Sequence, residues 1–122
     1  MRSQSGIVYI LQTPYGVKIG KTTKLEARLK ALAKEYDVVF VHAIGTHDIN
    51  NLERAFHRRF ADKRVKGVPS TEIFALSLAD IFSIQSLQHF QGKPCKHFTT
   101  LTDAVRHSIA VARRYYLQSY GR

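Results

Sequence analysis

The chain contains a single cysteine, Cys95, and no long apolar run among its 122 residues. One cysteine excludes an intrachain disulfide and fits a protein kept in a reducing compartment. The first residues lack the apolar core of a signal peptide, and no stretch approaches the length of a membrane span. We therefore expect a cytoplasmic or otherwise intracellular protein without a membrane partner.

A zinc site also lacks its ligands. Cys95 lies near His89 and His97, but four ligands at the usual spacing are absent. These three residues therefore do not predict a structural zinc centre.

Acidic residues are scarce, with 9 Asp and Glu against 19 Lys and Arg, and the formal net charge is +10. Basic residues are in excess both before and after residue 72, so this is not a neutral domain with a charged tail. A field of this sign favours a polyanionic partner, with nucleic acid the first candidate and an anionic membrane surface the second. The oligomeric state is not indicated by the sequence. A basic interaction protein, whose charge serves only solubility or assembly, is the weaker alternative.

The stretch from Gly6 to Thr22 has the pattern of a hairpin. Its first run is rich in β-branched and aromatic residues, which favours a strand, and the segment 13–16 has proline and glycine where a type I turn prefers them. With that turn, Tyr9 pairs with Gly20 and shares a sheet face with Lys18. Gly20 would then leave space for a group to approach the Tyr9 ring.

Helices and further strands follow this hairpin. Thr23 and Glu26 fit a capping box that begins a first helix, and residues 37–46 are apolar enough for a covered third strand. Asp48 is a suitable N-cap for a second helix. Its expected buried stripe consists of Ile49, Leu52, Phe56 and Phe60.

The remainder predicts a short strand within residues 71–76 and a third helix capped by Ser77. A last helix is expected from about Thr102 to Leu117. Its predicted stripe consists of Val105, Ile109, Ala112 and Tyr116.

We therefore predict an α/β fold of the α+β type. A small, mainly antiparallel three-stranded sheet flanked by helices occupies residues 1–90, and a basic C-terminal helical extension occupies residues 91–122.

Several of these residues together resemble the GIY-YIG nuclease family. Ile7-Val8-Tyr9 stands where the family has Gly-Ile-Tyr, and Lys18-Ile19-Gly20 stands where it has Tyr-Ile-Gly. Arg28 has the family's spacing after the second motif, and Glu53 lies on a helix like the one that supplies the family's metal-binding glutamate. The Lys-Ile-Gly form is similar to a branch found in phages, bacteria and fungi, and the resemblance covers roughly residues 6–76.

The resemblance implies a fold, a reaction and a set of roles. The expected activity is a magnesium-dependent endonuclease that hydrolyses DNA phosphodiester bonds, with Mg²⁺ (or Mn²⁺) as the cofactor. Glu53 would hold one metal ion, Tyr9 would orient or deprotonate the attacking water, and Arg28 would clamp the phosphate. The remaining expected catalytic residues are Lys18 and His57, and the expected substrate-binding residues are Lys21, Lys24 and Arg58.

Two positions depart from the family pattern. Lys18 replaces the second tyrosine, a proposed proton acceptor in some members, and the family's late asparagine is replaced in this region by Glu72 or Phe74. The rival interpretation is a nucleic-acid-binding module that keeps the fold but has lost cleavage.

Overall fold

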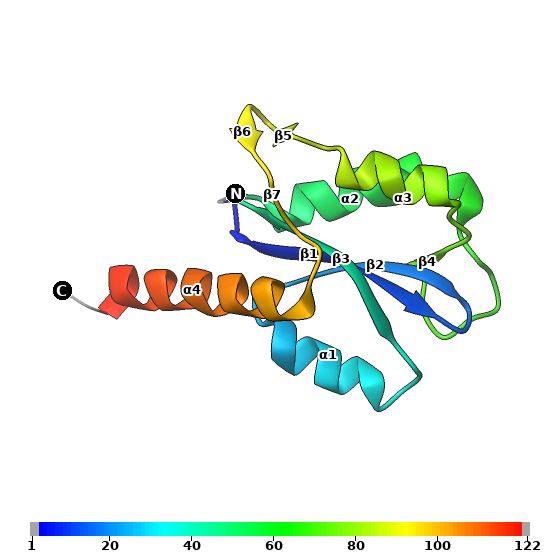
Figure 1. Cartoon of the computed structure of the whole chain (residues 1–122), viewed down its shortest axis with the longest axis horizontal. Helices are drawn as coiled ribbons and strands as arrows, with labels where there is room; N and C mark the ends of the chain where they lie inside the picture. The colour runs from blue at the N-terminus through cyan, green and yellow to red at the C-terminus, as the bar shows by residue number, and fades with distance from the viewer. Residues whose placement is uncertain (1–2, 121–122) are drawn as a thin grey trace.

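The computed structural model describes residues 3–120, which form a mainly antiparallel sheet with helices on both faces (Figure 1). The five-stranded sheet has the order β4-β2-β1-β3-β7. Its strands are β1 (Gly6–Thr13), β2 (Gly16–Thr22), β3 (Val39–Thr46), β4 (Ile73–Phe74) and β7 (Lys96–Phe98). A separate small hairpin joins β5 (His89–Phe90) to β6 (Lys93–Pro94).

Four α-helices complete the fold: α1 (Leu25–Ala33), α2 (Ile49–Arg59), α3 (Leu78–Gln85) and α4 (Leu101–Tyr120). A 3₁₀ helix, η1 (Ala61–Lys63), follows α2 directly. Across the part of the chain that the structure describes, none of the helices combines the length and the apolar character needed to cross a membrane. The predicted α+β class, with helices flanking a small antiparallel sheet, is confirmed.

The β1–β2 hairpin has the predicted register. Tyr9 pairs with Gly20, and Leu11 pairs with Lys18. The turn is closed by Thr13, whose hydroxyl donates to the Gly16 carbonyl at 2.8 Å and accepts from the Tyr15 N–H at 3.1 Å. Because side chains alternate along a strand, this register places Tyr9 and Lys18 on one sheet face.

The two faces of the sheet have separate cores. One core joins alternate residues of β1 to α1 and α4, and it contains Tyr9, Leu25 and Ala104. The other joins the opposite faces of β1 and β2 to α2 and α3, and it contains Ile19, Phe56 and Ile84. Figure 1 shows α2 and α3 on one side of the sheet, with α1 and α4 on the other. The sheet therefore separates Tyr9 from the helix that carries Glu53.

The sheet has two strands beyond the three predicted at its centre. The short strand expected within residues 71–76 is β4, which pairs with β2 at Val17 and Lys18. The strand β7 pairs with β3 and was not predicted. Three residues that include a lysine and a histidine carry too little periodicity to identify a strand. The expected division at residue 90 stays a prediction, and residues beyond it supply both β7 and α4.

Two of the three predicted helix caps are present. The Asp48 carboxylate accepts from the Asn51 N–H at 3.2 Å, and Ser77 forms a capping box with Asp80. The predicted box at Thr23 is wrong, because the N-cap of α1 is Lys24 and its side chain makes no capping bond. Instead the Ser108 hydroxyl of α4 accepts from the Leu25 N–H at 3.1 Å. A partner distant in sequence has replaced the local cap.

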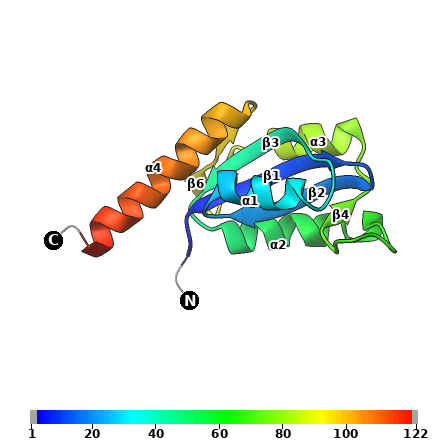
Figure 2. The same ribbon diagram turned by 90° about the horizontal axis from the view of Figure 1, so that it is seen from below.

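The last helix is present, but its predicted buried stripe is wrong in part. Within the predicted stripe, Val105 packs against the core beside the buried Ala104 and Ser108, whereas Ile109 is 51% exposed and Tyr116 is 61% exposed. Figures 1 and 2 both show the C-terminal half of α4 extending past the sheet. Helical periodicity predicted the apolar face, but only the first turns of α4 have a sheet to pack against.

Candidate active site

The site lies around β2, where its outer edge passes beyond the short strand β4. Since β4 pairs with β2 only at Val17 and Lys18, the end of β2 has no strand neighbour on that side among the described residues. The Ile19 N–H donates to the Glu72 carbonyl at 3.0 Å, and a ring nitrogen of His57 lies 2.9 Å from the Ile19 carbonyl. Side chains from both sheet faces therefore meet at this edge.

Tyr9 is completely buried on the face covered by α1 and α4. A Cβ atom at Gly20 would overlap its phenol ring and hydroxyl. The space expected at Gly20 is thus filled by Tyr9 itself, and it is not open to another group.

The Tyr9 hydroxyl has no hydrogen-bond partner among residues 3–120. Burial raises the pKa of Tyr9, and the nearby Arg28 guanidinium and Lys18 ammonium oppose that rise without overcoming it. The Arg28 group is close enough to influence the hydroxyl but lacks hydrogen-bonding geometry. Tyr9 is therefore a neutral phenol near pH 7 in this structure.

Lys18 is buried and tightly held. Its ammonium donates to the Glu72 carboxylate at 2.8 Å and to the Ser70 hydroxyl at 3.0 Å. Burial alone would lower the pKa of Lys18, but the Glu72 carboxylate outweighs burial and raises it. Lys18 is therefore a fixed positive charge and not a proton acceptor at neutral pH.

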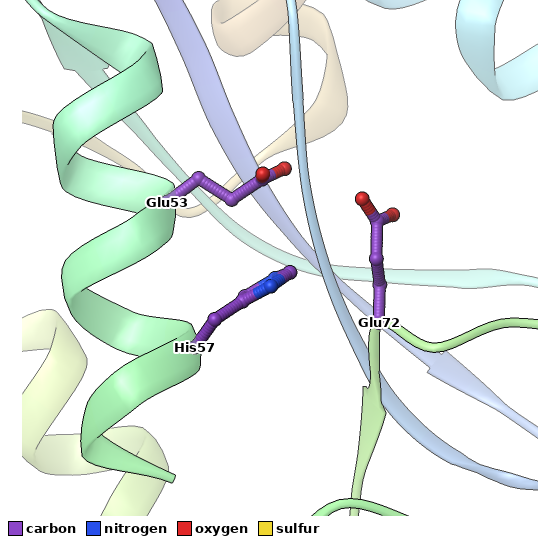
Figure 3. A group of neighbouring side chains, drawn as sticks. All are labelled: Glu53, His57 and Glu72. Atoms are coloured by element: carbon purple, nitrogen blue, oxygen red, sulfur yellow. The ribbon is translucent and has the colours of Figure 1, made fainter. Parts of the chain in front are cut away.

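Glu53 and His57 project from α2 toward Glu72, which immediately precedes β4 (Figure 3). One ligand atom from each of the three side chains lies within 4.8 Å of the other two. Glu53 is 8% exposed, and its Oε2 atom is buried without a hydrogen-bond partner among the described residues. Burial and the neighbouring Glu72 charge raise the pKa of Glu53.

These residues fit a divalent cation. Carboxylate oxygens and an imidazole nitrogen are common ligands of such ions. A buried carboxylate oxygen without a partner is costly, and a cation would remove that cost.

A basic hollow of about 460 Å³ lies beside the Tyr9 face of the site. Among its lining residues are Lys21, Lys24 and Arg28. The Lys21 ammonium donates to the Asn50 side chain at 2.6 Å and lies 3.9 Å from the Glu53 carboxylate. None of the described residues that line the hollow carries a carboxylate, so the hollow suits an anion such as a phosphate.

The structure therefore brings most of the predicted site residues together. The two groups of residues, Tyr9 with Arg28 and Glu53 with His57, are linked across β2 by Lys18 and Glu72. Arg58 is exposed on α2 and is not among the residues that line the hollow.

Sequence reasoning named Glu72 only as a substitute for an asparagine and missed its place beside Glu53. The available signal was the predicted short strand within residues 71–76, but the sequence did not identify the Lys18 strand as its partner.

The fold and the site define a small α+β domain that holds an acidic, imidazole-containing cluster next to a basic hollow. The chain belongs to the T5orf172 domain family, which matches residues 6–87. This domain is found in phage-type nucleases and GIY-YIG-associated proteins, and membership indicates interaction with nucleic acid. Neither the comparison with curated proteins nor the comparison with solved structures returned a match.

Proposed function

We propose that this protein is a metal-dependent endonuclease of the GIY-YIG type that acts on DNA inside the cell. The observation that carries the proposal is the buried, unpartnered Glu53 oxygen beside His57 and Glu72, next to a basic hollow. Membership in the T5orf172 family is compatible with this activity.

The roles follow from the chemistry of each group. Glu53 holds a Mg²⁺ or Mn²⁺ ion, which when bound neutralises charge on the phosphate and favours ionisation of water. Arg28 clamps a phosphate oxygen with its planar guanidinium. Burial keeps the Tyr9 phenol protonated, so Tyr9 orients the attacking water as a hydrogen-bond partner. Additional positive charge nearby would favour ionisation of the phenol.

The basic side chains have supporting roles. Lys18 contributes a fixed positive charge near Tyr9, consistent with its ion pair with Glu72. Lys21 and Lys24 bind the phosphates next to the scissile bond from the hollow, and Arg58 contacts the strand further along α2. His57 transfers a proton to the leaving oxygen from the neighbouring turn of α2.

The alternative is a nucleic-acid-binding module without cleavage. The observation in its favour is Lys18, whose protonated ammonium stands where GIY-YIG nucleases have their second tyrosine. Such a module would keep the basic hollow and lose the proton transfer.

The test compares wild type with Tyr9→Phe and Glu53→Gln on supercoiled and linear DNA, in Mg²⁺, Mn²⁺ or EDTA. Glu26→Gln is the matched control, because Glu26 is exposed on α1. We expect metal-dependent nicking that falls by at least about 100-fold in both site variants and is unchanged in the control.

Two other outcomes decide against the proposal. DNA binding without cleavage in every metal would favour the binding module. Cleavage that survives both substitutions would show that the reaction occurs elsewhere.

A further inference from the structure

Glu72 lies where the two halves of the site meet. Its Oε2 atom accepts from Lys18 at 2.8 Å, and its Oε1 atom has no hydrogen bond or ion pair with residues 3–120. Figure 3 shows its side chain directed toward the space that Glu53 and His57 also face. One oxygen of this carboxylate is thus already satisfied, and the other is free to bind.

The backbone and a hydroxyl group hold Glu72 in this position. The Glu72 N–H donates to the Ser70 hydroxyl at 3.1 Å, and its carbonyl accepts from the Ile19 N–H at 3.0 Å. The same Ser70 hydroxyl accepts from Lys18 at 3.0 Å. The carboxylate is therefore oriented before any ligand arrives, which reduces the entropic cost of binding.

His57 is oriented by an equivalent contact. Its Nε2 atom lies 2.9 Å from the Ile19 carbonyl oxygen, which can only accept, so Nε2 carries the proton. This tautomer leaves the lone pair on Nδ1. Metal-binding histidines are commonly fixed in this way, by donating their other N–H to a backbone carbonyl.

The negative charge of this cluster is only partly balanced by the neighbouring lysines. Two carboxylates converge, and Lys18 directly pairs with only one of them. Lys21 lies 3.9 Å from the Glu53 Oε1 atom, which leaves Glu53 Oε2 buried and unpartnered. Like charges at this separation are unfavourable unless a positive charge lies between them.

We propose that Glu72 is a second carboxylate ligand which, with Glu53 and His57, forms a three-residue site for a divalent cation that binds Mn²⁺ more tightly than Mg²⁺. This extends the proposed function, in which Glu53 alone was assigned to the metal. An imidazole ligand is the reason for the preference, since Mg²⁺ favours oxygen ligands and water whereas Mn²⁺ also accepts nitrogen.

The experiment measures binding of Mn²⁺ and of Mg²⁺ by calorimetry, without DNA, to wild type, Glu72→Gln, Glu53→Gln and His57→Gln. The matched control is Asp80→Asn, because Asp80 also pairs with a lysine, Lys63, at 2.6 Å but lies outside the cluster. Urea unfolding of each variant verifies that it is folded.

We expect Glu72→Gln to weaken Mn²⁺ binding by at least about 10-fold, the size of effect seen when groups around a metal are altered. The Asp80→Asn control should stay within about twofold. His57→Gln should reduce the preference for Mn²⁺ over Mg²⁺.

The outcomes separate this inference from the proposed function. If folded Glu72→Gln binds Mn²⁺ as tightly as wild type while Glu53→Gln loses Mn²⁺ binding, Glu72 is not a metal ligand. That result would leave the nuclease proposal intact. Loss in both variants, combined with a wild type that never cleaves DNA, would support the metal site and reject the nuclease. No binding of either ion by wild type would overturn the site itself.

Discussion

The Tyr9 ring packs directly against the backbone at Gly20. The phenol ring occupies the volume that a side chain at position 20 would need, and Tyr9 has no exposed surface through which to move away. The missing side chain at Gly20 therefore determines where the Tyr9 hydroxyl lies. A glycine in a strand commonly marks such a close approach.

Replacing Gly20 with alanine should displace this ring. We expect Gly20→Ala to lower the free energy of unfolding by about 1–3 kcal/mol, as overpacking of a core does. Urea unfolding measures the effect, and a double-mutant cycle with Tyr9→Ala tests its origin. If the cost of Gly20→Ala were the same with and without the Tyr9 ring, the overlap would not be its cause.

The planar guanidinium of Arg28 is proposed to bind a phosphate oxygen through two donors. On the proposed function, Arg28→Lys keeps the charge but loses the planar pair of donors, so we expect single-turnover cleavage to slow by about 10- to 100-fold. Arg54→Lys is the control, because Arg54 is exposed on α2. Equal rates in the two variants would mean that Arg28 contributes only charge.

The elements of the sheet centre were predictable because their signals are local. Alternation and the turn at residues 13–16 determined the hairpin register, and Asp48 and Ser77 marked helix starts correctly. Local sequence patterns did not predict features that depend on residues distant in the sequence. Ser108 caps α1 from α4, and Glu72 reaches Glu53 only because β4 pairs beside Lys18.

The strand β7 is joined to β3 by a pair of histidines. A ring nitrogen of His97 lies 2.5 Å from the Leu87 carbonyl and so carries the proton, and its other nitrogen then accepts from His42 at 2.7 Å. This leaves the buried His42 Nδ1 without a partner among the described residues. Burial, with a smaller effect of His97, lowers the pKa of His42 from 6.5 to about 4.

A depressed histidine pKa makes stability depend on pH. As the pH falls below 6.5, the unfolded chain protonates His42 while the folded chain does not, so stability present above 6.5 is lost progressively down to about pH 4. We expect this residue to account for about 3 kcal/mol of the loss. Urea unfolding at several pH values should show a shallower pH dependence in His42→Phe than in wild type. The control His89→Gln removes an exposed histidine and should retain the wild-type slope.

For the whole molecule, the question is whether the charge of +10 acts as a diffuse field or through the hollow. Binding that neutralises phosphates releases counterions, so the logarithm of the affinity falls linearly with the logarithm of salt concentration. If Lys21 and Lys24 each contact a phosphate, changing both to glutamine should reduce that slope by about 2. Fluorescence anisotropy with a DNA duplex across a salt series measures it.

The control for this measurement changes Lys34 and Lys93 to glutamine, which alters the net charge equally at exposed positions outside the hollow. If the charge acts as a diffuse field, the two double variants should show the same salt dependence. If the phosphates bind in the hollow, only the Lys21 and Lys24 double variant should reduce the slope by about 2. Wild-type binding without any salt dependence would leave the charge a role in solubility or assembly alone. The experiment thus decides among three explanations of one basic sequence by asking where its charges act.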